Sequence, residues 1–537
     1  MPSQFTLPLK LVTVHRGPLV LFLWCFLLMA TLCGCAPSGP PNANGPSGEV
    51  VEIETIEVIP ADGGKAPAGV DTATNVIDDD VSATKQAADK AKADADEAIN
   101  EAAKTIEPLK NTDADATEKA GAEPLPKVDG AAAPDAASSA APQAAARVAT
   151  VGDRAQERVA LGEPALTAGV PGSGALTLEQ IDEWLAHPKN SLVLEPVLPL
   201  GLSQGAGQIQ GLERNPLTRA KIELGRQLYF DTRLSADSTV SCASCHNPTE
   251  GYSAHTKTGV GIRGQLGNRH SPVSFNRILS GAQFWDGRAD SLEAQAVGPI
   301  ANPIEMGFTH EGVVKRLQEI PVYKRQFDAI FGSLTIDGIA QAIAAFERVL
   351  VTAPSPYDFN EQLRSFAALD ADDIAEDPEL SARFAAAQAS VAAQPLSADA
   401  LRGREIFFTA KGNCTACHVG ANLADERYHN IGIGMDKPAA DLGRFTVTQD
   451  ALDKGAFKTP TVRNVTLTAP YMHDGSIATL EEVVEWYDKG GHPNPNLSDK
   501  IRPLKLTPEE KSDLVAFMKA CTGQTPSVAV DRLPTDN

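Results

Sequence analysis

The spacing of hydrophobic residues divides the chain into three stretches. Residues 19–29 form an almost unbroken apolar run, whereas residues 36–175 are rich in Ala, Pro, Gly, Asp and Ser and show no sustained apolar periodicity. From residue 176 to about 525, apolar residues recur at the spacing of amphipathic helices. The pattern predicts a mainly α-helical body behind a leader and a long polar segment.

Helices are predicted in the body wherever apolar residues return every three to four positions, and long β-type alternation is absent. One helix is expected to begin at residues 176–179, and further helical patterns cover 220–228, 311–318, 336–350, 396–408, 480–487 and 508–519. The order of helix, short motif, irregular stretch and closing helix occurs twice. This repetition predicts an internal duplication, with a linking arm at about 355–395.

Two short motifs, C-A-S-C-H at 242–246 and C-T-A-C-H at 414–418, occupy corresponding places in the two halves. Two thiols at this spacing can each form a thioether to one porphyrin, and the following His can bind its iron. The sequence therefore predicts two covalent haem c groups in two cytochrome c-like lobes, 176–355 and 396–525. The attaching thiols and proximal ligands are Cys242, Cys245 and His246 in the first lobe and Cys414, Cys417 and His418 in the second.

The leader has the features of an export signal. Lys10 and Arg16 precede the apolar run, which is too short to cross a membrane but suits a signal-peptide core. Residues 32–35 read L-C-G-C and resemble a lipobox, which predicts removal of residues 1–34 and lipidation of Cys35. An ordinary signal peptide or an anchor helix is the alternative. Because c-type haem is attached outside the bacterial cytoplasmic membrane and Ala36 resembles an outer-membrane sorting residue, we expect a lipid anchor on the periplasmic side, at the outer membrane.

Residues 35–175 are predicted to be a disordered tether, because they cannot bury enough apolar surface to offset the entropy lost on ordering. A partner-binding module is the alternative. The formal net charge is −22, and more than half of it falls on residues 36–165. An acidic chain argues against nucleic acid as a partner and is compatible with a basic electron-transfer protein.

One of the eight cysteines has no predicted use. Cys25 and Cys33 fall in the leader, Cys35 takes lipid and four cysteines take haem, which leaves Cys521. No structural disulfide can then form in the mature chain. We expect Cys521 to be a small buried apolar side chain near a helix end, with a redox role as the alternative.

The segment between the motifs, especially 284–289 (F-W-D-G-R-A) and 298–307, is dense in unusual residues. Glu305 stands between Ile304 and Met306, where burial would raise its pKa and make it a candidate acid/base. From these residues alone, a solvated or ion-paired Glu is the simpler interpretation, and Trp285 is a core aromatic.

These stretches, both C-x-x-C-H motifs, T-P-T-V-R-N-V at 459–465 and Y-M-H-D-G at 471–475 together resemble the bacterial dihaem cytochrome c peroxidase family, which includes MauG-type oxygenases. The resemblance covers about residues 215–525. It implies that the first haem is peroxidatic and the second transfers electrons. It also implies that Glu305 is the distal acid/base, Gln295 a distal polar residue and Trp285 the aromatic between the haems.

The sequence departs from the classical peroxidases at two ligand positions. Ile262, flanked by glycines, stands where those proteins supply a distal His, and His255 lies off that position. The first haem is therefore expected to be open to peroxide, with His255 at the surface. For the second haem the resemblance implies Tyr487 as distal ligand, as in MauG-type proteins, whereas chemistry alone favours Met472.

The resemblance also implies one calcium ion between the lobes. Thr468 and Pro470 match positions that present backbone carbonyls, which are suitable calcium donors. The family's Asn ligand aligns with His270, which is a poor calcium ligand, although Asn268 is nearby.

The function implied by the resemblance is reduction of hydrogen peroxide with electrons from a small cytochrome c or cupredoxin. Glu305 would move a proton between the two peroxide oxygens while Gln295 orients the molecule. The alternative is a MauG-like oxidase that modifies a protein or cofactor precursor. Ile262 and Tyr487 favour this alternative. A non-catalytic dihaem electron carrier is the third possibility, but a carrier does not need Glu305 and Gln295.

Overall fold

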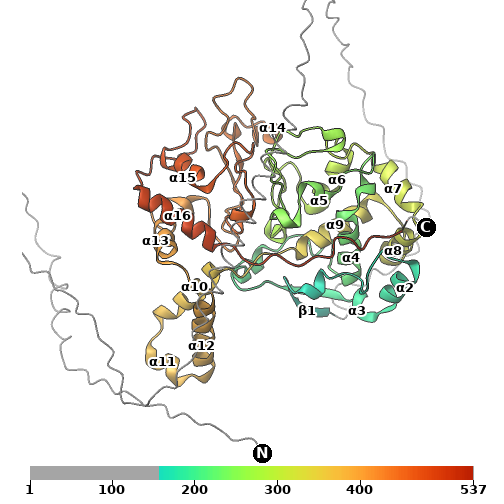
Figure 1. Cartoon of the computed structure of the whole chain (residues 1–537), viewed down its shortest axis with the longest axis horizontal. Coiled ribbons are helices and arrows are strands. Elements are labelled where there is room, and N and C mark those ends of the chain that lie inside the picture. The colour runs from blue at the N-terminus through green and yellow to red at the C-terminus, as the bar shows by residue number, and fades with distance from the viewer. Residues whose placement is uncertain (1–155, 536–537) are drawn as a thin grey trace, which may run out of the picture. The chain divides into compact units, whose positions relative to one another are not determined.

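The computed structural model describes residues 156–535 (Figure 1). The predicted leader, the lipid site at Cys35 and the tether up to residue 155 lie outside the described residues. The described part is mostly helical, as predicted, and also contains two small sheets. In the parallel sheet β1 (Gln156–Ala160) pairs with β2 (Val193–Val197), and in the antiparallel sheet β3 (Tyr428–His429) pairs with β4 (Phe457–Lys458).

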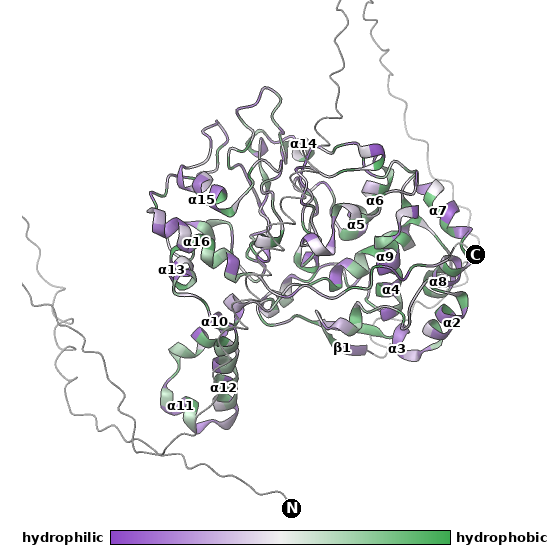
Figure 2. Ribbon diagram, in the orientation of Figure 1, coloured by the Kyte–Doolittle hydropathy of each residue, from purple (hydrophilic) through white to green (hydrophobic). Residues whose placement is uncertain are grey.

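The first lobe is built around two closely packed helices, α4 and α9. A Cβ at Gly225 of α4 would overlap the carbonyl of Ala342 in α9, so only glycine allows this crossing. Helix α9 is mostly hydrophobic in Figure 2 and is the centre of the apolar core. The helices of this lobe are α2 (Leu178–Ala186), α3 (Pro188–Ser191), α4 (Arg219–Phe230), α5 (Cys242–Cys245), α6 (Leu292–Ala301), α7 (His310–Gln318), α8 (Pro321–Phe331) and α9 (Ile336–Val349).

The second lobe repeats this plan with fewer residues. A Cβ at Gly403 of α13 would overlap the carbonyl of Asp513 in α16, so a glycine again sits at the crossing of the two core helices. Cys521, at the C-terminal end of α16, is completely buried, as predicted. The helices are α13 (Ala398–Phe407), α14 (Phe445–Thr448), α15 (Leu480–Asp488) and α16 (Pro508–Ala520).

Between the lobes, the predicted linking arm forms three helices: α10 (Pro356–Arg364), α11 (Ala371–Glu376) and α12 (Pro378–Ala393). Helices α11 and α12 project from the body in Figure 1. At the base of the arm, Asp358 of α10 forms a buried two-bond ion pair with Arg463, at 2.8 and 2.9 Å, and Arg463 also donates to the carbonyl of Gly201. Fully paired and hydrogen-bonded charges are compatible with such burial.

The body begins earlier and ends later than predicted. Residues 156–175, assigned to the tether, contribute buried side chains to the first core, among them Leu161 and Val170. After α16 the chain returns to the first lobe, where the buried Arg532 donates to the Val170 carbonyl at 2.9 Å. The partner of segment 156–175 is thus a tail more than 350 residues away, and local composition could not reveal it.

No single described helix is long and apolar enough to cross a membrane. Helices α8 and α9 reach that criterion only as a pair, which is bent by 85° at the break between them.

Candidate di-haem site

One cavity of about 1010 Å³ joins the two lobes, and every residue predicted to hold haem lines it. The four motif thiols are free and face this cavity rather than pairing as disulfides. A cavity with two Cys-Cys-His sets on its walls fits two thioether-linked porphyrins. The predicted lining residues brought together here are Cys242, Cys245, His246, Cys414, Cys417, His418, Trp285, Gln295, Glu305, Thr468, Pro470, Met472 and Tyr487.

The first motif forms the short helix α5, and His246 caps its end by donating its backbone N–H to the Cys242 carbonyl at 3.0 Å. Burial lowers the pKa of the His246 imidazole to about 4, which keeps the ring neutral and able to ligate a metal. Nearby carbonyls of Tyr252 and Pro272 oppose this shift, but neither completes a hydrogen bond to the buried Nδ1. The ring fits a proximal iron ligand.

In the second motif, the residues Cys414–Ala416 form a 3-10 turn that precedes His418. Nδ1 of His418 lies 3.1 Å from the Leu423 carbonyl, and because a carbonyl can only accept, Nδ1 carries the proton. The lone pair is then on Nε2, the nitrogen left for a metal. Burial also lowers the pKa of this histidine.

Glu305 faces the cavity beside the first motif. Burial is the largest influence on its carboxyl and raises the pKa, while Arg288 and Asn302 oppose the shift. The carboxylate in turn helps to raise the pKa of the Cys245 thiol, so the two groups are neighbours. A raised pKa makes the Glu305 carboxylate a stronger proton acceptor than an exposed one, which suits a general acid/base.

The loop around Ile262, which lacks a distal His, contacts the backbone of Glu305. Ile262 is buried and donates its backbone N–H to the Glu305 carbonyl at 2.8 Å. A Cβ at Gly261 would overlap the Ile304 carbonyl, so this close approach requires glycine. His255 is exposed and its Nε2 lies 3.0 Å from the Leu467 carbonyl, so the prediction of a surface His is confirmed.

Gln295 projects from α6 into the same cavity, and its side-chain amide makes no hydrogen bond to any described residue. The amide offers both a donor and an acceptor to a small polar molecule. Glu305 and Gln295 therefore provide the polar groups that the sequence predicted for the first haem pocket.

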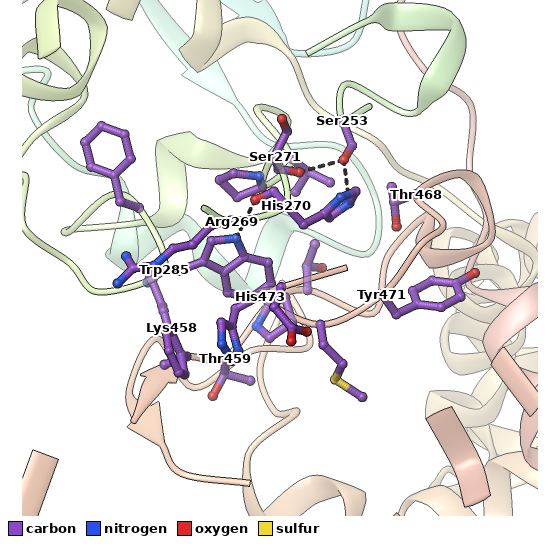
Figure 3. A pocket seen from close by; sticks show the side chains of 18 of the residues that line it. Ser253, Arg269, His270, Ser271, Trp285, Lys458, Thr459, Thr468, Tyr471 and His473 are labelled. Atoms are coloured by element: carbon purple, nitrogen blue, oxygen red, sulfur yellow. Dashed lines mark hydrogen bonds between the residues drawn. The ribbon is translucent and has the colours of Figure 1, made fainter. Parts of the chain in front are cut away.

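Trp285 lies at the junction of the lobes (Figure 3). Its indole Nε1–H donates to the His270 carbonyl at 2.8 Å, and its own carbonyl accepts from the backbone N–H of Lys458 in the second lobe, also at 2.8 Å. The indole is thus held at the link between the two halves of the cavity.

Both predicted alternatives for the distal side of the second haem reach the cavity. Tyr487 lies on α15, where burial raises its pKa and the Cys417 and Cys414 thiols add to the shift. Met472 stands on the neighbouring turn with a positive φ of 74°. The phenol is thus a neighbour of the second motif.

The predicted calcium positions meet at a histidine rather than at an oxygen-bearing side chain. Thr468 and Pro470 line the cavity, but the aligned His270 is buried with both ring nitrogens engaged, at 3.1 Å from the Ser253 hydroxyl and 3.1 Å from the Thr256 carbonyl. Asn268 is exposed. Calcium binds oxygen ligands, and the imidazole of His270 supplies none at the position where the family's Asn was expected.

Three charged residues of the cavity wall were not singled out from the sequence. Arg277 donates to Gln283 at 2.8 Å and has no carboxylate within ion-pair distance among the described residues. Glu347 has a pKa raised to about 8 by burial, and one of its oxygens has no hydrogen-bond partner. Lys458 is also buried, which lowers its pKa to about 8. The only sequence signal for such buried charges was a charged residue inside an apolar run, as for Glu347 within residues 343–350.

Comparisons with known proteins agree with this geometry. Residues 219–363 match the family model of di-haem cytochrome c peroxidase, and residues 400–522 match that of cytochrome c. The methylamine utilization protein MauG of Methylorubrum extorquens is 37% identical over 325 residues, which are 60% of this chain and 83% of that protein. The cytochrome c551 peroxidase of Nitrosomonas europaea is 38% identical over 322 residues, 59% of this chain and 84% of that protein.

A solved structure, a MauG-like protein associated with microbial copper homeostasis, is also similar. It is 31% identical, with a TM-score of 0.50, and the match covers 59% of this chain and 93% of the other. Similarity across both haem motifs and the segment between them shows the family. The chain belongs to the di-haem cytochrome c peroxidase family, which includes MauG, and is an oxidoreductase of the peroxidase type with two haem c groups.

Proposed function

We propose that this chain reduces hydrogen peroxide with electrons from a small cytochrome c or cupredoxin. The supporting observation is a single cavity with both C-x-x-C-H motifs on its walls and, beside the first of them, Glu305 and an unengaged Gln295. A protein that only carries electrons has no use for an acid/base and a free amide over one haem position.

Haem bound at these thiols would supply two redox-active irons that exchange electrons with peroxide. The protein's part is proton transfer and positioning. The Glu305 carboxylate takes a proton from the inner peroxide oxygen and returns it to the outer one, so that water rather than hydroxide leaves. The Gln295 amide orients the molecule by hydrogen bonds to its oxygens. Trp285, held between the lobes, is the proposed electron path.

A MauG-like oxidase that acts on a protein or a cofactor precursor is the second candidate. Two observations favour it: the buried Ile262, which aligns with the distal His of classical peroxidases, carries no ligating group, and the Tyr487 phenol lies near the thiols of the second motif. A hard phenolate ligand would stabilise oxidised iron and would suit storage of an oxidising equivalent more than rapid delivery of electrons.

The cellular location is proposed from the sequence alone. Residues 1–34 would be a signal peptide, and Cys35 would be lipidated. The polar segment that precedes residue 156 would be a tether that holds the enzyme at the outer membrane, on its periplasmic side.

Steady-state turnover of peroxide by the holoprotein, with reduced cytochrome c or a cupredoxin as donor, tests the first candidate. We expect donor oxidation that depends on peroxide and a resting electron paramagnetic resonance spectrum with a high-spin component. Peroxide consumption with neither donor but with an added protein substrate would favour the MauG-like oxidase. Two fully low-spin haems and no turnover would identify an electron carrier instead.

A further inference from the structure

The junction between the lobes is built from direct contacts around His270 (Figure 3). His270 is 4% exposed, and its backbone N–H donates to the His473 carbonyl in the second lobe at 2.8 Å. Its carbonyl accepts from the Trp285 indole at 2.8 Å. Both backbone groups of His270 are therefore hydrogen-bonded, one to each neighbouring segment.

The imidazole of His270 lies among oxygen atoms of both lobes. In the first lobe its nitrogens contact the Ser253 hydroxyl and the Thr256 carbonyl, and the Ser253 hydroxyl donates in turn to the Ser271 carbonyl at 2.6 Å. Thr468 of the second lobe lies beside the ring in Figure 3. Burial lowers the pKa of His270, and the Thr256 and Thr468 carbonyls oppose this shift.

A calcium ion at this junction would need the same oxygens. Calcium takes six to eight oxygen ligands, which come from carboxylates, from backbone or amide carbonyls and from waters. The acidic side chains near the junction are committed elsewhere: Asp441 and Asp286 pair with Arg269, each at 2.7 Å, and Asp474 pairs with Lys437 at 2.9 Å. At the aligned position the ring supplies no oxygen ligand, its two nitrogens are already engaged, and the nearby carboxylates are paired with cations, so this set of side chains does not fit a divalent cation.

Direct contacts also join the lobes without an ion. The ion pair between Arg269 and Asp441 crosses the junction, and Arg444 of the second lobe donates to the carbonyls of Asp286 and Gly287 at 2.9 and 3.0 Å. A Cβ at Gly475 would overlap the Lys257 carbonyl, so the two loops are already in close contact. We propose that this protein holds its two haem lobes together without calcium, and that the His270 imidazole occupies the space between the lobes that an ion would fill.

The first test uses the wild-type holoprotein, dialysed against EGTA and then against buffer with CaCl2. We expect no calcium above the buffer background by elemental analysis, and the same thermal midpoint and haem absorption spectrum with EGTA and with CaCl2. One calcium retained per chain, together with a lower midpoint after EGTA treatment, would overturn the proposal. This measurement stands even if no variant folds, and it does not depend on peroxide turnover.

The second test replaces the ring by the amide that the alignment expects. His270→Asn should lower the thermal midpoint in EGTA by about 4 °C or more, because buried groups lose their partner and a void is left. Millimolar CaCl2 should restore part of that loss, since the asparagine oxygen and the vacated carbonyls can then hold an ion. The matched control is His255→Asn, which removes an exposed ring from the Leu467 carbonyl and should shift the midpoint by less than about 1 °C. The proposal would be contradicted if the thermal midpoint of His270→Asn equalled that of the control. It would also be contradicted if CaCl2 did not raise the midpoint of His270→Asn.

Discussion

The two haem lobes have closely similar backbones and different side chains in the cavity. Asn276 in the first lobe and Asn464 in the second both adopt left-handed conformations, with φ of 56° and 54°, at the start of a 3-10 turn. Eight residues later in each lobe, Phe284 and Met472 again have positive φ, 68° and 74°. The duplication expected from the motifs thus extends to individual turns.

The closing helices α6 and α15 then present the same three positions to the cavity. Their N-caps, Ser291 and Thr479, lie at the same distance along the chain from the two left-handed asparagines. The matched lining residues are Gln295 and Val483, Ala296 and Val484, and Pro299 and Tyr487. The first lobe therefore has a free amide and a proline with no ligating group, whereas the second has an apolar residue and a phenol. One backbone plan thus places a free amide in one lobe and a phenol in the other.

The largest expected effect falls on the first lobe. Glu305→Gln keeps the shape of the side chain but removes the proton acceptor, so peroxide turnover should fall by roughly 10²- to 10⁴-fold. Haem content, measured by absorption, should be unchanged. Glu311→Gln, on the exposed start of α7, is the control and should retain full activity. Full turnover in Glu305→Gln would refute the acid/base role.

The second lobe is tested by removing its two possible ligands separately. Tyr487→Phe should change the absorption and magnetic resonance spectra of the second haem and raise its reduction potential by on the order of 100 mV, because a hard oxygen ligand favours oxidised iron. Met472→Leu should leave spectra and potential unchanged, since Met472 matches Phe284 in the duplicated turn. The reverse result would assign Met472 as the ligand.

The shared backbone plan can be weakened in either lobe. Gly225→Ala and Gly403→Ala each force a methyl group against a facing helix carbonyl, and each should cost about 1–3 kcal/mol of unfolding free energy. Denaturant unfolding, followed by haem absorption, measures the loss. Gly207→Ala is the control, because nothing lies within 4 Å of the added methyl group. Equal stability of all three variants would show that the helix crossings are not as close as described.

The smallest effect concerns a group with no counterpart in the second lobe. Glu347 has a pKa of about 8 in the folded protein and about 4.3 when unfolded. Between these values the native state retains a proton that the unfolded state loses, so stability should fall as the pH rises to about 8 and should level off above it, where both states are deprotonated. Glu347→Gln should flatten this dependence between pH 6 and 9, measured as the thermal midpoint, while Glu319→Gln at the surface should not. Identical slopes in all three proteins would exclude Glu347 as the source.

Local patterns predicted the helices well, because apolar periodicity and the C-x-x-C-H spacing are properties of short segments. The predicted start of α4 at residue 220 lies one residue from the observed start at Arg219, and the burial of Cys521 is as expected. The sequence could not predict that Arg532 donates a hydrogen bond to the Val170 carbonyl, because that contact joins distant segments. It also could not predict that Arg277 and Glu347 share one cavity wall, since burial of a charge depends on tertiary packing.

The returning tail makes the first lobe depend on the last residues of the chain. Arg226, in the middle of α4, donates to the carbonyls of Ala529 and Arg532, and a parallel bridge joins Leu176 to Pro534. A nick or a fusion near residue 525 would therefore disturb a lobe whose last helix, α9, ends at Val349. A truncation that removes the second lobe would also remove the tail that packs on the first, so the first lobe is not one continuous segment of the chain.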